Sequence, residues 1–87
     1  MPILSRFNGI TVLMHSERGE QHNKPHIHCR YGDKEMVMDF YGNIMQGSFP
    51  KNQLKQVREW ILLHQKELFE NWELLYNGEQ PFKIPAL

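Results

Sequence analysis

Short apolar runs separated by turn residues fill the first half of the chain, which is the pattern of an antiparallel β-meander. Asn8-Gly9 stands between two such runs, and this dipeptide favours a tight hairpin because both residues tolerate positive φ. Gly32-Asp33 and Tyr41-Gly42-Asn43 mark two further turns. The predicted strands are Ile3–Phe7, Ile10–His15, His26–Tyr31, Glu35–Phe40 and a short edge strand, Ile44–Gln46.

The second half repeats its apolar residues at helical spacing. Ser48 lies just ahead of Pro50, and proline is favoured at the first position of a helix. Gly78 is a candidate C-cap, and Pro81 would prevent the helix from continuing. We predict one long helix over about residues 50–77, followed by an extended tail, 79–87. The apolar stripe of this helix consists of Leu54, Val57, Ile61, Leu68, Trp72 and Leu75, with His64 in its middle position.

A helix of this length poses a packing problem. It would extend about 42 Å at about 1.5 Å per residue, whereas a six-residue strand spans about 20 Å. Either the helix breaks near His64-Gln65, or its second half extends past the sheet and must be covered by the tail or by a second chain. The predicted fold class is α+β: a meander of four to five short strands over residues 3–46, then the helix, in a single domain 1–87.

Composition narrows the range of functions. The 87 residues are 40% hydrophobic, and ten basic side chains balance ten acidic ones. A net charge of zero argues against a general nucleic-acid or membrane-surface binder. The sequence shows neither an apolar N-terminal signal segment nor a run of about 18 apolar residues that would span a membrane. The single cysteine, Cys29, excludes an internal disulfide, so we expect a cytoplasmic protein.

A histidine cluster is the first chemical feature of the sequence. His22, His26 and His28 form the pattern H-x3-H-x-H at the start of a predicted strand. Residues i and i+2 of a strand share a face with Cα atoms about 6.6 Å apart, so two imidazoles can meet one ion. His22 could fold back from the loop as a third ligand, and His15 could contribute from the neighbouring strand. Three imidazoles and an open position are typical of a catalytic site for a divalent metal such as zinc.

Two other interpretations of the same residues stay open. In the first, the histidines are structural or surface residues on a solvated strand face, with Ile27 and Cys29 on the buried face. Alternatively, His26, His28 and Arg30 share a face without a metal. A histidine beside an arginine can then combine acid–base catalysis with a phosphate clamp, as RNA cleavage requires. Cys29 itself is predicted to be a small buried side chain without reactivity.

The predicted helix has an unusual distribution of charge. Its first two turns carry Lys51, Lys55 and Arg58, whereas the later acidic residues, which oppose the helix dipole, are Glu59, Glu67, Glu70 and Glu73. Two such helices packed antiparallel would set each basic half against an acidic half, which predicts a homodimer. The basic stripe could instead contact a small acidic protein partner or nucleic-acid phosphates. A solvated helix whose charges have no partner is the third interpretation.

Several motifs in this order resemble a known family. They begin with Ser5-Arg6-Phe7 and Gly9-Ile10, continue through Pro25-His26-Ile27-His28 and Arg30-Tyr31-Gly32, and end in a helix with Trp60, His64, Glu67-Leu68 and Trp72-Glu73. The chain thereby resembles, over nearly its whole length, the small bacterial proteins catalogued as domain of unknown function 4160. Family members usually carry two prolines before the histidine, and Lys24 replaces the first of them here. The resemblance assigns no catalytic residues.

Family members are often encoded beside another small domain, so the resemblance implies a two-gene module. The leading hypothesis from the sequence is therefore a dimerising or partner-binding protein of a toxin–antitoxin-like or regulatory module, acting through its C-terminal helix. The alternative is a metal-dependent or RNA-cleaving hydrolase that uses His22, His26 and His28, with Arg30 as a further catalytic candidate.

Overall fold

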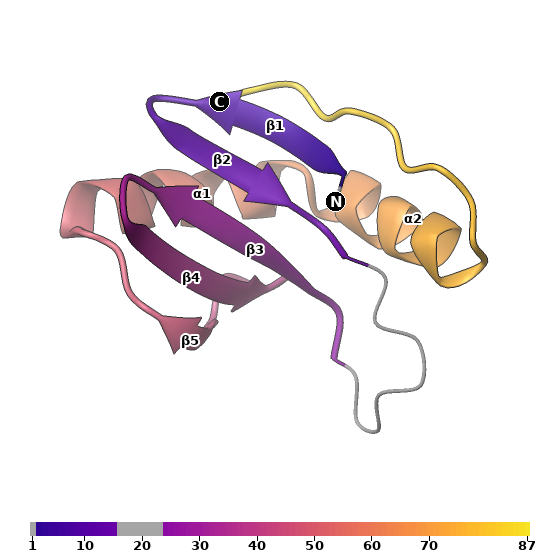
Figure 1. Cartoon of the computed structure of the whole chain (residues 1–87), viewed down its shortest axis with the longest axis horizontal. Helices are drawn as coiled ribbons and strands as arrows, with labels where there is room; N and C mark the ends of the chain where they lie inside the picture. Colours follow the sequence, from indigo (N-terminus) through magenta and orange to yellow (C-terminus); the bar gives the residue numbers. More distant parts are fainter. Residues whose placement is uncertain (1, 16–23) are drawn as a thin grey trace.

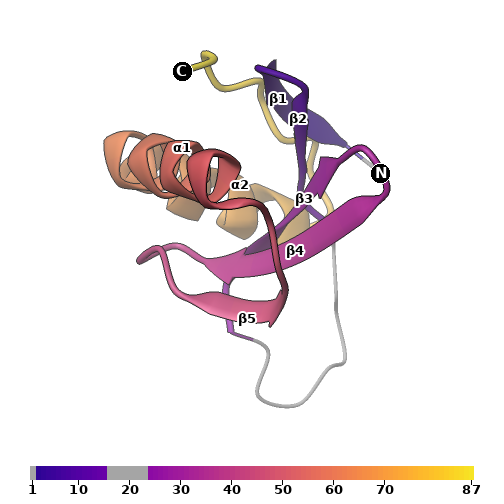
Figure 2. The same cartoon turned by 90° about the vertical axis from the view of Figure 1, so that its left-hand side faces the viewer.

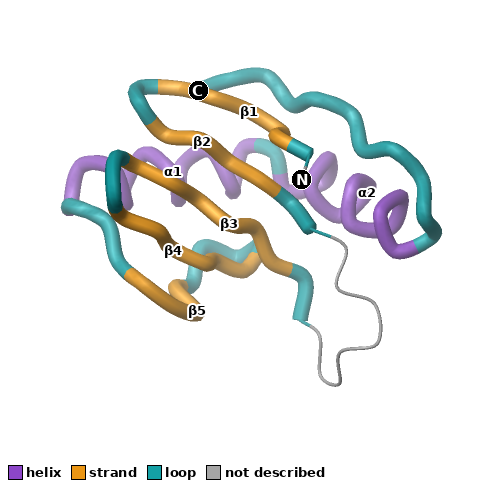
Figure 3. Tube along the Cα trace, in the orientation of Figure 1, coloured by secondary structure: helices purple, strands orange, loops and turns teal. Residues whose placement is uncertain are grey.

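The computed structural model describes residues 2–15 and 24–87 of the chain. A five-stranded antiparallel sheet with the strand order β1-β2-β3-β4-β5 is followed by two helices, so the α+β class and the meander are confirmed. Figures 1 and 3 show the strands side by side in chain order, with the helices behind them. The strands are β1 Ile3–Phe7, β2 Ile10–Leu13, β3 His26–Tyr31, β4 Lys34–Asp39 and β5 Ile44–Gly47.

The turns that the sequence marks do connect the strands. Asn8 and Gly9 both have positive φ, 50° and 80°, as a tight hairpin between β1 and β2 requires. Gly32, with φ 60°, begins the two-residue connection between the paired residues Tyr31 and Lys34. These local conformations set the register that places side chains from neighbouring strands in the same row.

The prediction of one long helix is wrong. The segment forms α1, Lys51–Leu63, and α2, Gln65–Tyr76, with His64 between them at φ −116° and ψ 25°. The helix therefore breaks near His64-Gln65, which is one of the two ways in which so long a segment can pack on a short sheet. It allows both halves to bury apolar side chains against one sheet, because α2 need not follow the axis of α1. The buried residues are Val57, Trp60 and Ile61 on α1 and Leu68, Asn71 and Leu75 on α2.

The core lies between one face of the sheet and the helices, as Figure 2 shows. It takes alternate residues from the strands, so β4 contributes Met36 and Met38 while Glu35 and Val37 remain more accessible. Trp60 is fully buried at the centre of this layer, and its ring lies 5.7 Å from that of Phe7. The opposite face of the sheet carries no helix within the described residues.

The C-terminal tail returns along the outer edge of the sheet, beside β1 (Figure 1). The N–H of Ile84 donates to the carbonyl oxygen of Leu4 at 2.9 Å, and Ile84 is buried. Asn71 of α2 binds both the N–H and the carbonyl of Phe82, and the indole Nε1 of Trp60 donates to the carbonyl of Pro85. The tail therefore covers part of the apolar surface, as expected, and shields the β1 edge.

No helix in residues 2–15 and 24–87 combines the length and apolar character needed to cross a bilayer.

Candidate functional site

His26 occupies a buried position at the start of β3. Its side chain is only 6% exposed, and its Nδ1 lies 2.6 Å from the carbonyl oxygen of Lys24. The imidazole also packs against Trp72 of α2, with 5.3 Å between ring centroids. His26 is therefore a buried structural histidine and not a solvated one, because this end of the strand reaches the helix layer.

Two more imidazoles lie beside His26. The ring of His28 is 5.2 Å from that of His26 and 4.1 Å from that of His15, which follows β2. His15 and His28 meet edge to face, a favourable arrangement for aromatic rings. His15 thus lies beside His28, just after the end of β2 and not within the strand, and its role as a further metal ligand stays a prediction.

The proposed metal ligands are only partly placed. His22 lies outside the described residues, so the set His22, His26 and His28 cannot be assembled from the structure. Among residues 2–15 and 24–87, no three histidine, cysteine, aspartate or glutamate side chains are grouped to hold a metal ion. A zinc site that includes His22 stays a prediction for elemental analysis.

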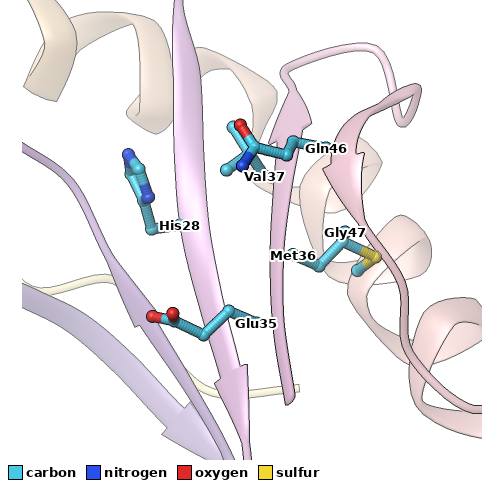
Figure 4. A pocket seen from close by; sticks show the side chains of 6 residues that line it. All are labelled: His28, Glu35, Met36, Val37, Gln46 and Gly47. Atoms are coloured by element: carbon cyan, nitrogen blue, oxygen red, sulfur yellow. The ribbon is translucent and has the colours of Figure 1, made fainter.

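A shallow groove of about 250 Å³ opens beside His28, on the sheet face that carries no helix in the described part of the chain. His28, Val37 and Gln46 form one cross-strand row over β3, β4 and β5, so their side chains share this face. Figure 4 shows their side chains with that of Glu35, which belongs to the next row. The lining residues are His28, Glu35, Met36, Val37, Gln46 and Gly47.

Arg30 stands in the same row as Glu35 and forms an ion pair with it. Its Nε lies 3.1 Å from Oε1 of Glu35, and both side chains are substantially exposed. The predicted catalytic set is thus divided: His28 lines the groove, Arg30 borders it through Glu35, and His26 is turned to the helix layer. Glu35 and Gln46 were missed, because cross-strand register rather than local spacing brings them to His28.

Cys29 is a buried, unreactive thiol, as the strand alternation predicts. Its side chain is fully buried within the core cluster. Burial disfavours the thiolate and raises the pKa of Cys29 to about 12. The thiol therefore stays protonated at neutral pH and cannot serve as a nucleophile.

A second candidate surface lies at the β5 edge, which sequence reasoning also missed. We define the edge surface as the large apolar side chains exposed around this strand: Tyr41, Ile44, Met45, Leu62 and Phe69. The β4–β5 turn is fixed against the helices, because Arg58 donates to the carbonyl of Gly42 and Gln65 to that of Phe40. The ring of Phe69 lies 6.0 Å from that of Tyr41.

Leu62 belongs to this surface by helical spacing. It lies four residues after Arg58 in α1, so it shares the helix face from which Arg58 reaches the β4–β5 turn at Gly42. Its side chain is 60% exposed. The signal in the sequence is the segment Ile44–Gly47 itself, which is an edge strand without a charged residue or a proline.

The helix break also changes the meaning of the charge pattern. Glu67 lies in the first turn of α2, where an acidic side chain is favourable to the helix dipole. Its carboxylate contacts the imidazole of His64: Oε1 of Glu67 lies 2.8 Å from Nδ1 of His64. The basic start of α1 and the acidic end of α2 still oppose the dipoles of their helices.

Comparison with known proteins gives one match. The family model described as domain of unknown function (DUF4160) matches residues 9–73, from the β1–β2 turn to the last turns of α2. The match includes the β5 edge and the groove beside His28, and it ends before the tail. No curated protein and no solved structure matches the chain.

Proposed function

The chain belongs to the family described as domain of unknown function (DUF4160), and we propose that it acts by protein–protein association through its β5 edge. The occupant of this edge is a second copy of the chain. Two β5 strands paired antiparallel about a twofold axis form one continuous sheet across both copies.

The open, uncharged edge of β5 carries this proposal. Within the described residues β5 pairs only with β4, so its outer N–H and C=O groups face away from the sheet. Natural edge strands usually carry lysine, proline or another device against pairing. The opposite edge is protected, because the tail residue Ile84 binds β1 at Leu4. β5 carries no charged residue or proline, no described segment covers it, and it exposes Ile44 and Met45 by 41% and 44%. Its remaining devices against pairing are its length of four residues and the register irregularity opposite Val37 and Met38.

Apolar side chains next to the strand support the same association. Ile44 pairs with the core residue Met38, so its side chain lies on the helix side of the sheet, together with the other side chains of the edge surface. A twofold pairing of β5 would bring Tyr41, Ile44 and Leu62 of both copies together on that side. Covering this surface removes apolar area from water, which is the main driving force of association.

Charge favours a second copy over a strongly charged partner. The formal net charge of the chain is zero, so two copies approach without overall repulsion. The strand Ile44–Gly47 has no ionisable side chain, and its antiparallel pairing with itself places no like charges opposite each other. A twofold particle also presents two copies of every remaining surface, which suits the partner-binding role in a two-gene module that the family resemblance implies.

Sedimentation velocity over a range from micromolar to near-millimolar protein tests the proposal. We expect the wild-type chain to sediment with twice the mass of one chain, and the variant Met45→Lys to sediment as a monomer. Lysine at this exposed position leaves β5 paired with β4 but opposes pairing at its outer edge. Leu62→Lys is expected to weaken the dimer as well.

Leu63→Lys is the matched control. Leu63 is 67% exposed but lies about 100° around the helix from Leu62, away from the β4–β5 turn. The same change of side chain should therefore leave the dimer intact. A wild-type chain that stays monomeric at every concentration overturns the proposal, as does a dimer that tolerates Met45→Lys with unchanged affinity.

A further inference from the structure

The groove beside His28 has a chemical character distinct from that of the edge surface. Its rim combines an imidazole from His28, a carboxylate from Glu35 and a primary amide from Gln46, above the aliphatic side chain of Val37 (Figure 4). The second imidazole, His15, adjoins His28 at 4.1 Å. Hydrogen-bond donors, acceptors and flat π-surfaces thus border one small concave site, independent of the β5 edge proposal.

The charges of the groove argue against most ionic ligands. Among residues 2–15 and 24–87, the lining includes no lysine or arginine, and the neighbouring cation, Arg30, is already paired with Glu35. A phosphate or carboxylate would meet Glu35 without a free cation to offset it. A divalent metal ion needs several anionic or imidazole ligands, and no such group of three exists in the described residues.

Size and polarity favour a flat, neutral ligand. A volume of about 250 Å³ is below the range of about 300–1,000 Å³ typical of sites for drug-sized molecules, so one small ring system fits. A purely aliphatic ligand would make no use of the polar groups of Glu35 and Gln46 that border the groove. A planar heteroaromatic ring is small enough for the groove and also uses its polar groups. Its face stacks on imidazole, and its edge offers hydrogen-bond donors and acceptors.

We propose that this groove binds a single nucleobase, which stacks on His28 and directs its polar edge to Glu35 and Gln46. Guanine fits best, because its edge presents two adjacent N–H donors to a carboxylate and an oxygen acceptor to an amide donor. Glu35 uses Oε1 for Arg30, and an ionised carboxylate has about four acceptor positions in total. Because the described lining has no lysine or arginine, binding here would rely on stacking and hydrogen bonds, without the backbone contacts to cations that single-strand binders usually add.

Titration of the wild-type chain by NMR, with guanosine, adenosine, cytidine and uridine in turn, tests this site. We expect guanosine to bind with the highest affinity and to shift the His28, Glu35 and Gln46 resonances. A short single-stranded oligoribonucleotide containing one guanine, titrated at two salt concentrations, distinguishes an unpaired base in a strand from a free nucleoside. If the strand is the natural source, it binds more tightly than guanosine, and salt changes its affinity little.

Substitutions define the roles of the lining residues. We expect His28→Ala to weaken guanosine binding by about tenfold through loss of stacking. Glu35→Gln should remove the preference for guanosine over adenosine. Glu59→Gln is the control, because Glu59 is an exposed acid on α1, which packs on the opposite face of the sheet from the groove. Circular dichroism and thermal unfolding check that each variant is folded.

Two results overturn the nucleobase site. One is the absence of binding by every nucleoside and by the oligoribonucleotide up to millimolar concentration. The other is binding that survives His28→Ala and Glu35→Gln unchanged, since the ligand would then occupy a different surface. Neither result bears on the β5 dimer, whose test measures mass and needs no nucleoside.

Discussion

Nζ of Lys24 lies 2.8 Å from Oδ2 of Asp39, and this ion pair ties the segment before β3 to the last residue of β4. The Asp39 side chain is fully buried, whereas that of Lys24 is half exposed. Asp39 also accepts from the backbone N–H of Tyr41 and of Asn43, each at 2.9 Å, and from Nδ2 of Asn43. One carboxylate therefore organises the β4–β5 turn that supports the edge surface.

The pKa of Asp39 predicts a loss of stability in acid. Burial alone would raise this pKa, but Lys24 and the hydrogen bonds outweigh burial and lower it to about 2 from the usual 3.8. The unfolded chain thus takes up a proton more readily than the folded chain. The stabilisation is complete above about pH 4 and is lost as the pH falls through about 2. We expect urea unfolding to show a decrease on the order of 2 kcal/mol over this window.

Asp39→Asn identifies the source of this decrease. The amide of asparagine must place an N–H₂ group beside a donor, so at neutral pH we expect a loss of about 1–3 kcal/mol. The variant should then show a smaller change of stability between pH 4 and pH 2. Asp33→Asn, at an exposed turn position, should retain the wild-type acid profile. An unchanged acid profile for Asp39→Asn would contradict the assignment.

The fold could be predicted largely from turn residues and periodicity. Asn8-Gly9 and Gly32 have positive φ, so they fix where β1 and β3 end and where β2 and β4 begin. The helix break was visible only as a conflict between helix length and strand length, because the apolar stripe continues on both sides of His64. Nothing in the local sequence at His64 resembles a strong helix breaker, and packing against the sheet decides the outcome.

The candidate sites were less predictable for a related reason. Spacing along one strand correctly placed His28 and Arg30 on one face, but it did not reveal that His26 meets Trp72 of α2. Gln46 reaches the groove through its pairing with Val37, beside an irregularity in the β4–β5 register. Register between strands and contacts between layers depend on the whole chain, so a single sequence does not specify them.

Among the described glycines, we expect Gly47 to be the one at which substitution by alanine costs the most stability. Its φ is 78°, and a Cβ at this position would overlap the backbone carbonyl oxygen of Glu35 in β4. Gly47→Ala therefore requires the end of β5 to move away from β4, and we expect a loss of stability well above that caused by backbone strain alone. Urea unfolding gives the size of the loss, and amide hydrogen exchange shows whether β5 has opened.

Gly32→Ala separates strain from overlap. Gly32 also has positive φ, 60°, but a Cβ there has no neighbouring atom within 4 Å. We expect a cost of about 1–2 kcal/mol from the left-handed conformation, without faster exchange in β5. Equal losses for the two variants would show that the contact with Glu35 does not restrict β5. If β5 does open in Gly47→Ala, the dimer should be weakened too.

Asn71 holds the tail that protects the opposite edge of the sheet. Its side chain is fully buried, with Nδ2 2.8 Å from the carbonyl oxygen of Phe82 and Oδ1 2.9 Å from the N–H of Phe82. Asn71→Ala leaves both backbone groups without these partners, and we expect a loss of about 2–3 kcal/mol. Asn52→Ala, at an exposed position near the start of α1, should change stability by less than about 0.5 kcal/mol.

Asn71→Ala also tests whether the tail is what closes the β1 edge of the sheet and leaves β5 as the one open edge among the described residues. Loss of the Asn71 contacts should free the tail, expose the β1 edge beside Leu4, and give each copy a second strand edge for pairing. A chain with two open edges can add copies without limit, whereas a chain with one can only dimerise. Sedimentation should therefore show species larger than a dimer for Asn71→Ala, and Met45→Lys in the same chain should reduce them to dimers joined at β1. A destabilised Asn71→Ala variant that still stops at the dimer would show that the tail stabilises the core without guarding the edge.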